Sequence, residues 1–115
     1  MDENAREIVM TDKIIVFSTC PGVKEAKKLA GHLVEQRLAA CVNLVKIASC
    51  YRWKGKVAHE PEVLLIIKTS RTLFGRLRAE WERLHSYEIP ELIAIPIVEG
   101  AATYMDWLER ELAPQ

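Results

Sequence analysis

The longest extended stretch of the sequence runs from Cys41 to Thr69 and holds one tight-turn signal near its middle. Its two arms, 41–53 and 57–69, are rich in Val, Ile, Tyr and Trp, which suit a pleated, half-buried surface. Between them stands Lys54-Gly55, and glycine takes a positive φ at no steric cost, so a β-hairpin is predicted to close there. Each arm is roughly a dozen residues long, about twice the usual strand length. We therefore expect the hairpin to extend beyond a domain of this size and its tip to be covered by other subunits.

Pro61 limits how the second arm of this hairpin pairs. Proline has no amide hydrogen and does not fit the middle of a central strand, so the arm is expected to lie at an edge, or to be bulged or broken near Glu60-Pro61-Glu62. Two interpretations stay open: a bulge only bends the hairpin, or it turns Glu60 or Glu62 into a cleft.

Apolar strand patterns alternate with helical patterns on both sides of the hairpin. The other predicted elements are a strand over 13–19, a helix over 23–38, a helix over 73–84 after an N-cap at Ser70, a strand over 92–98 and a helix over 100–112. Each strand-helix-strand unit needs a right-handed crossover between parallel strands. The pattern predicts an α+β, ferredoxin-like split β-α-β sandwich with a long central hairpin and an extra C-terminal helix. Both crossover helices then cover one face of the sheet, and the other face is left open.

The composition favours one domain without nucleic-acid or membrane partners. The 115 residues are expected to comprise a flexible acidic N-terminal extension over 1–12 and a single domain over 13–115. Sixteen Lys plus Arg balance 16 Asp plus Glu, which disfavours a nucleic-acid or anionic-membrane partner. No leader pattern and no apolar stretch near 18 residues is present. The three cysteines form no CxxC pair, so reduced thiols and a cytoplasmic location are expected.

A polar and aromatic segment, His85–Glu91, links the second helix to the last core strand. Loops held between rigid elements are the usual place for binding sites. Pro90 holds Ile89 in an extended conformation, so Tyr87 and Glu91 are positioned by a stiff backbone. The alternative, that this segment is only a stiff connection in which Tyr87 packs, stays open.

The sequence contains no preformed metal-binding motif and no motif of a nucleophilic or nucleotide-binding enzyme. The three histidines have no His-x-His or HExxH spacing, and neither GxSxG nor GxGxxG occurs. His85 is a candidate metal ligand, because imidazole suits copper and zinc. Cys20-Pro21-Gly22 stands where a helix begins, and two interpretations stay open: a plain helix entry, or a position that lowers the thiol pKa. We therefore expect no enzymatic activity and no required cofactor.

Five segments together resemble the CutA family of divalent-cation tolerance proteins. They are LAACVN (38–43), S-x-Y-x-W-x-GK (49–56), E-x-x-LLIIKT (62–69), H-x-Y-E-x-PE (85–91) and Y-x-x-W (104–107), and the likeness runs from about residue 13 to the end. The resemblance implies a ferredoxin-like homotrimer with PII-like architecture, in which the hairpin joins three subunits. It also implies copper binding through a first-strand cysteine and a pair of histidines. This sequence departs from that set, with Ser18 at the cysteine position, Cys20 as the nearest thiol, and Leu84 beside the remaining His85.

The leading hypothesis is a trimeric protein of divalent-metal tolerance that binds copper or another divalent ion weakly, or senses a small ligand. The alternative is a trimeric scaffold that binds a small anionic metabolite or a protein partner in clefts between subunits. Tyr51 and Trp53 are predicted at the trimer interface. The residues predicted around an intersubunit cleft are Asn43, Glu62, Lys68, Tyr87 and Glu91. A Lys68–glutamate ion pair that only locks the interface is the other interpretation of this set.

Overall fold

The structure is a computed structural model and describes residues 8–115. In chain order its elements are β1 (Ile8–Met10), β2 (Lys13–Cys20), α1 (Val23–Glu35), β3 (Cys41–Trp53), β4 (Lys56–Ser70), the 3₁₀ helix η2 (Arg71–Leu73), α2 (Phe74–Leu84), β5 (Ile93–Pro96), β6 (Glu99–Ala101) and α3 (Ala102–Glu111). None of the helices in these residues is long and apolar enough to cross a membrane.

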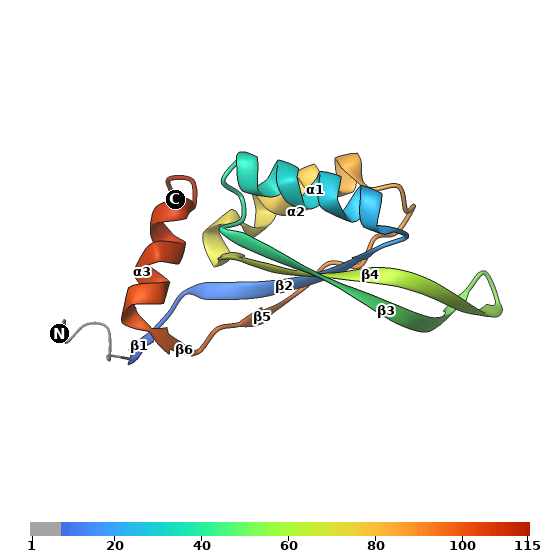
Figure 1. Ribbon diagram of the computed structural model, residues 1–115, viewed down its shortest axis with the longest axis horizontal. Coiled ribbons are helices and arrows are strands. Elements are labelled where there is room, and N and C mark those ends of the chain that lie inside the picture. Colours follow the sequence, from blue (N-terminus) through green and yellow to red (C-terminus); the bar gives the residue numbers. More distant parts are fainter. Residues whose placement is uncertain (1–7) are drawn as a thin grey trace.

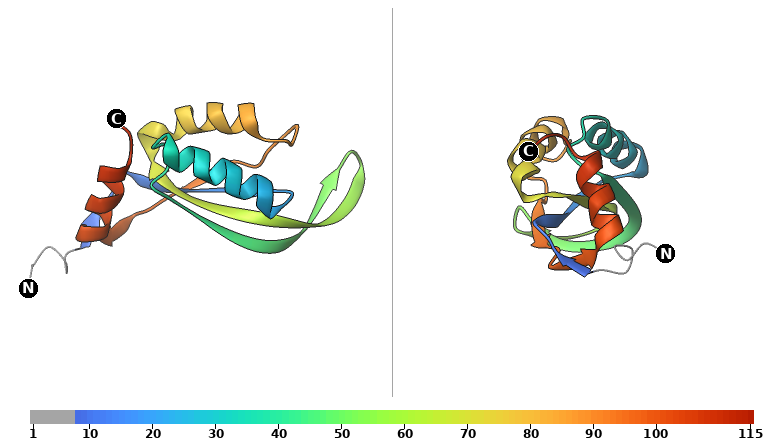
Figure 2. Two further views of the ribbon diagram at one scale, coloured as in Figure 1. Left: turned by 45° about the horizontal axis from the view of Figure 1, so that its top comes forward. Right: turned by 90° about the vertical axis from the view of Figure 1, so that its left-hand side faces the viewer.

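The main sheet has the strand order β3-β4-β2-β5, and all three neighbouring pairs are antiparallel. Strands β2 and β3 therefore run parallel with β4 between them, and β4 and β5 run parallel with β2 between them. Helices α1 and α2 lie side by side on one face of this sheet (Figures 1 and 2). This is the split β-α-β arrangement of the ferredoxin-like fold, so the predicted fold class is confirmed.

The hairpin of β3 and β4 is the longest feature of the molecule. Its ladder runs without interruption from the Cys41–Lys68 pair to the Trp53–Lys56 pair. The turn residues Lys54 and Gly55 have φ angles of 50° and 80°, which is the two-residue hairpin turn whose twist matches the strands. Beyond the end of β2 the hairpin extends past the helices (Figure 1), and the molecule measures 55 × 23 × 22 Å.

Pro61 causes no bulge, so the expectation of a bulge or break in β4 is wrong. It stands directly opposite Ala48, and the register is the same on both sides of this pair. The ladder between β2 and β4 ends at the Cys20–Val63 pair, so β4 has a free edge at Pro61. A proline at an edge costs no ladder hydrogen bond, and the prediction of an edge position is confirmed.

The core lies between the sheet and its two helices. Val16 of β2 and Leu65 and Ile67 of β4 are fully buried there, together with Leu77 and Trp81 of α2. Alternate side chains of the strands point to the opposite face, which neither α1 nor α2 covers (Figure 2). On that open face large apolar side chains are exposed: Val45 (44%), Ile93 (57%) and Ile95 (46%).

The N-terminal segment and the last predicted strand differ from expectation. Residues 8–10 form β1, which pairs with β6, whereas a flexible extension was predicted over 1–12; residues 1–7 lie outside the described part of the chain. The single strand predicted over 92–98 is shorter, and the chain after Pro96 leaves the main sheet to form β6. The amide of Ile97 still donates to the Lys13 carbonyl at 2.9 Å, so the chain leaves the main sheet just after this bond.

Helix boundaries also shift, and the last helix spans Ala102–Glu111 rather than 100–112, because Glu99–Ala101 form β6. Helix α1 ends at Glu35 rather than at Leu38, because Arg37 takes a positive φ of 59° and the amide of Leu38 donates back to the Leu33 carbonyl at 2.9 Å. After Ser70 the chain forms a 3₁₀ turn before α2 begins at Phe74, and the Ser70 hydroxyl makes no capping hydrogen bond.

Candidate functional site

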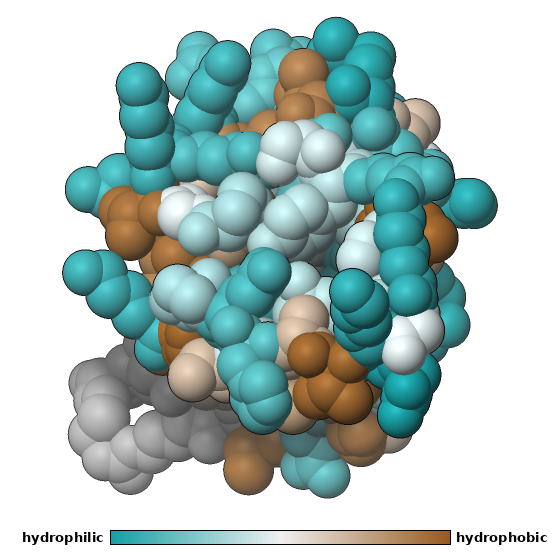
Figure 3. All heavy atoms as spheres, turned by 90° about the vertical axis from the view of Figure 1, so that its right-hand side faces the viewer, coloured by the Kyte–Doolittle hydropathy of each residue, from teal (hydrophilic) through white to brown (hydrophobic). Residues whose placement is uncertain are grey.

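The free part of the hairpin and the loop after α2 enclose a hollow of about 710 Å³. Its lining combines carboxylates and aromatic rings with a few apolar side chains, and among residues 8–115 no Lys, Arg or His contributes to it. The glutamates that line it are Glu60, Glu62, Glu88 and Glu91, and the aromatic residues are Tyr51, Trp53 and Tyr87. Seen from the hairpin end, the molecular surface is mostly hydrophilic with a few separate hydrophobic patches (Figure 3).

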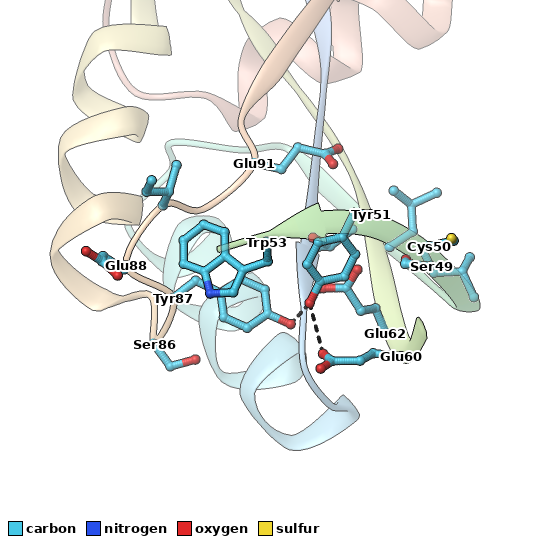
Figure 4. Close-up of a pocket in the computed structure, with 14 residues that line it drawn as sticks. Ser49, Cys50, Tyr51, Trp53, Glu60, Glu62, Ser86, Tyr87, Glu88 and Glu91 are labelled. Carbon is cyan, nitrogen blue, oxygen red and sulfur yellow. Dashed lines mark hydrogen bonds between the residues drawn. The ribbon is translucent and has the colours of Figure 1, made fainter. Parts of the chain in front are cut away.

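Two tyrosine hydroxyls hold carboxylates of β4 in place. Tyr51 of β3 donates to Oε2 of Glu60 at 3.0 Å, and Tyr87 of the loop donates to Oε2 of Glu62 at 2.7 Å. Figure 4 shows both hydroxyls pointing toward these acidic side chains. Because residues 60 and 62 of a strand point to the same face, the regular register of β4 places both glutamates on the open side of the sheet. The hydrogen bond of Tyr87 therefore joins the loop to the hairpin.

Glu62 is buried, with 8% of its surface exposed. Its hydrogen-bond donor is a neutral hydroxyl, and among residues 8–115 it forms no ion pair. Burial raises the pKa of Tyr87, and the hydrogen bond to Glu62 raises it further, because both favour the neutral phenol. The Tyr87 hydroxyl therefore keeps its proton at physiological pH and donates a hydrogen bond to Glu62.

A second group of candidate ligand side chains lies where β2 ends and α1 begins. Cys20, Glu25 and His85 each offer a ligand atom, and these atoms lie within 4.8 Å of one another. The Cys20 sulfur is 3.6 Å from Nε2 of His85, and Nδ1 of His85 is 3.6 Å from Oε2 of Glu25. The fold therefore brings together the two predicted metal ligands and adds Glu25, which the sequence analysis missed.

Both nitrogens of the His85 ring already have backbone partners. Nε2 lies 2.7 Å from the Thr19 carbonyl oxygen, and the amide of Tyr87 donates to Nδ1 at 3.0 Å. A carbonyl oxygen only accepts and an amide N–H only donates, so the pattern is that of a neutral imidazole protonated at Nε2. Burial raises the pKa of the Cys20 thiol to about 12, and the charges of Glu25 and Glu62 add to that shift. A metal ion at this group has to displace a hydrogen bond and a thiol proton.

The predicted cleft residues occupy two separate places in one chain. Glu62, Tyr87 and Glu91 line the hollow, as do the predicted interface residues Tyr51 and Trp53. Asn43 and Lys68 do not. Lys68 is six residues from Glu62 along the same strand, a distance of roughly 20 Å.

The interpretation of Lys68 as half of an ion pair that locks the interface between subunits stays a prediction. Among residues 8–115, Lys68 forms no salt bridge, and its Nζ lies 5.9 Å from the ring centroid of Tyr104. Whether Asn43 and Lys68 join the other cleft residues across a subunit boundary stays a prediction.

Glu25, which the sequence analysis missed, could have been found from its position in the first turn of α1. Glu25 follows Cys20 by five residues across a short strand-to-helix turn, so its carboxylate returns toward the end of β2. It also accepts hydrogen bonds from the amide and the hydroxyl of Ser86, at 3.2 and 2.9 Å. No sequence feature of this kind indicates Glu88, because the conformation of the loop after α2 alone places it at the hollow.

Known proteins with similar sequences belong to one family. Residues 14–111 match the family model described as CutA1 divalent ion tolerance protein. The chain is 45% identical over 95 residues to the divalent-cation tolerance protein CutA of Thermus thermophilus, which covers 82% of this chain and 92% of that protein. It is also 45% identical over 95 residues to the human protein CutA, of which it spans 53%.

Solved structures agree with the sequence relatives. The structure of CutA from Synechococcus elongatus has a TM-score of 0.92 at 32% identity, and the match covers 96% of this chain and 99% of that one. The Thermus thermophilus divalent cation tolerance protein (Cut A1) has a TM-score of 0.85 at 42% identity, over 88% of this chain and 99% of that one. The chain therefore belongs to the CutA1 divalent ion tolerance family.

Proposed function

We propose that this protein acts in divalent-cation tolerance as a non-enzymatic homotrimer that binds a divalent ion, with copper the first candidate, weakly. The observation that carries this proposal is the convergence of Cys20, Glu25 and His85 within 4.8 Å. A thiol, an imidazole and a carboxylate suit copper or zinc. The names of the relatives support the same role, since they describe divalent-cation tolerance.

The surroundings of the three ligands are the reason to propose weak binding. Cys20 binds a metal as the thiolate, and a thiol whose pKa is raised to about 12 holds its proton at neutral pH. His85 has to give up its hydrogen bond to the Thr19 carbonyl or to the Tyr87 amide before a ring nitrogen can bind an ion. Three free cysteines agree with a reducing compartment, so we propose a cytoplasmic location.

The homotrimer is supported by the open face of the sheet and by the projecting hairpin. Exposed apolar side chains on a sheet face favour association, because they are better covered than left in water. The Trp53 side chain at the hairpin tip is 40% exposed and can pack against a neighbouring subunit.

Titration of copper into the purified protein, with zinc as a redox-inert probe, tests the metal proposal. We expect saturable binding near one ion per subunit, lost in Cys20→Ser and in His85→Ala. The affinity should rise with pH, because binding releases the thiol proton. Cys50→Ser is the matched control, since Cys50 is exposed and lies outside this group. Absence of saturable binding, or binding that both variants retain, would refute the proposal.

A second candidate function is a scaffold that binds a small ligand in the hollow between the hairpin and the loop. The volume of the hollow, about 710 Å³, favours this candidate because it is in the range of small-molecule sites. It does not favour the anionic metabolite of the sequence-based alternative, because in the described part of the chain four glutamates and no basic residue line it.

A further inference from the structure

We propose that Cys50 is a redox modification site, where the thiol exchanges with a small disulfide that carries carboxylates and becomes a mixed disulfide. This inference does not depend on metal binding by Cys20, Glu25 and His85. It rests on the exposure of Cys50, on its contact with His59 and on the charges that share its side of the hairpin.

Cys50 is the most accessible of the three thiols. It is exposed, whereas Cys20 is buried and Cys41 is half-buried. The Cys20 thiol keeps its proton, because burial raises its pKa to about 12. The Cys41 sulfur lies 3.9 Å from the Asn43 side-chain oxygen, and an amide oxygen takes up no proton at neutral pH. A reaction of a thiol in the folded protein is therefore expected at Cys50.

His59 stands directly opposite Cys50 in the ladder between β3 and β4. Opposed residues of an antiparallel pair point to the same side of the sheet, and the Cys50 sulfur lies 3.9 Å from Nε2 of His59. The thiolate rather than the thiol attacks a disulfide, and an adjacent base that accepts the thiol proton supplies this thiolate. The fold therefore places His59 where it can act as that base.

The Cys50 side chain lies on the side of the hairpin that faces the same way as the helix-covered face of the sheet. Val42 of β3 packs against the core under the helices, and Cys50 points to the same side because the two positions differ by an even number. Tyr51 and Trp53 point to the other side, where the proposed trimer is joined. Figure 4 shows the Cys50 sulfur pointing away from the Tyr51 ring. The thiol is thus on the side away from that proposed contact.

The side of the hairpin that carries Cys50 is positively charged. Arg52 and Lys46 stand two and four positions from Cys50 along β3, so their side chains point to the same side as the thiol. Glu60 and Glu62 are the only acidic residues of the hairpin, and they point to the other side, because each stands opposite an odd-numbered residue of β3. Positive side chains attract anions from solution. These charges favour a disulfide that carries carboxylates.

The proposed step is a thiol–disulfide exchange. His59 accepts the Cys50 proton, and the thiolate attacks one sulfur of the small disulfide. A new S–S bond forms between Cys50 and that sulfur, the original S–S bond breaks, and the other half leaves as a thiolate that takes up the proton. The protein thiol is oxidised, and the small disulfide is reduced by the same two electrons. An excess of the small thiol reverses the step.

Incubation of the protein in its native oligomeric state with glutathione disulfide tests the proposal, with mass spectrometry of peptides as the readout. We expect Cys50 to gain one glutathione well before Cys41, and excess reduced glutathione to remove it. His59→Asn should slow this reaction at least about fivefold, because the base is lost. His32→Asn is the matched control, since His32 lies on α1 and contacts Glu80, and it should react like the wild type.

Arg52→Gln tests the charge selection and keeps the proposal testable if His59→Asn does not fold. Cystamine is a small disulfide of the opposite charge. The ratio of the rates with glutathione disulfide and with cystamine should fall about two- to fivefold in Arg52→Gln, because one exposed charge interaction is lost. Lys56→Gln is the matched control and should change this ratio less, since Lys56 stands opposite Trp53 on the other side of the hairpin. Equal changes in the two variants would overturn the charge selection.

Absence of glutathione from Cys50 in the native oligomer would overturn the proposal, as would modification of Cys41 at the same rate or equal rates for the wild type and His59→Asn. Cross-linking of two chains through Cys50, in place of a glutathione adduct, would overturn it as well. A non-reducing gel detects this product by its doubled mass, and the partner of the thiol would then be a second copy of this chain.

Discussion

The indole Nε1 of Trp81 donates a hydrogen bond to the Ser18 hydroxyl at 2.8 Å, inside the core. The same hydroxyl donates to the backbone carbonyl of Glu91 at 2.5 Å. Ser18 thereby connects β2 with α2 and with the loop that borders the hollow. The Ser18 hydroxyl is completely buried, and it acts both as an acceptor, for Trp81, and as a donor, to Glu91.

We expect Ser18→Ala to lower the free energy of unfolding, because it leaves the Trp81 N–H and the Glu91 carbonyl without partners in the core. Each orphaned group costs roughly 1–3 kcal/mol. Urea unfolding at a fixed protein concentration measures this loss. In a Trp81→Phe background the same substitution should cost less, since one of the two partners is already absent. Equal losses in the two backgrounds would contradict the proposed link.

Lys13 is buried and bonds to two exposed carboxylates, with Asp12 at 2.5 Å and Glu109 at 2.7 Å. Its hydrogen bonds hold the pKa values of Asp12 and Glu109 below their ordinary values of 3.8 and 4.5. A carboxyl group whose pKa is lower in the folded state stabilises the fold above its unfolded pKa, and this stabilisation is lost as the pH falls through the folded pKa. We expect Lys13→Met to flatten the loss of stability below about pH 4.

Acid titration of the unfolding free energy measures that slope. Lys24→Met is the control, because Lys24 is exposed on α1 and forms no ion pair among residues 8–115. If the unfolding free energy of both variants falls equally steeply with decreasing pH, Lys13 has no role in the pH dependence.

The Cys20 thiol should resist alkylation in the folded protein. With its pKa raised to about 12, about one thiol in 10⁴ is ionised at pH 8, and burial also blocks access. Iodoacetamide should therefore modify the exposed Cys50 first and reach Cys20 only after unfolding. Mass spectrometry of peptides from native and unfolded samples measures the two rates. Similar native rates for Cys20 and Cys50 would contradict the prediction.

Trp53→Ala should weaken the proposed trimer. In one chain the Trp53 side chain is 40% exposed, and the loss of a buried aromatic anchor at an interface typically costs at least about 2 kcal/mol. Light scattering over a dilution series should show dissociation of the variant at a higher concentration than that of the wild type. Lys56→Ala, at the neighbouring exposed position of the hairpin, is the control. A wild-type protein that is monomeric at all concentrations would refute the trimer.

The sequence alone determined the hairpin, the two crossover helices and hence the ferredoxin-like fold. These features depend on local chemistry: a glycine that permits a positive φ at residue 55, and apolar side chains at helical or alternating spacing. The sequence also indicated the loop of Tyr87 and Glu91 and the candidates Cys20 and His85, since these residues stand at the ends of regular elements.

Only the tertiary structure decided which of these residues meet. Glu25 joins Cys20 and His85 because α1 packs beside the end of β2. Lys68 is separated from Glu62 because it stands six positions further along one unbroken strand. Pro61 remains unbulged because the ladder between β2 and β4 ends before reaching it, which leaves β4 with a free edge there. Such relations join residues far apart in the sequence, and local propensity carries no information about them, because they arise when sheet and helices pack around one core.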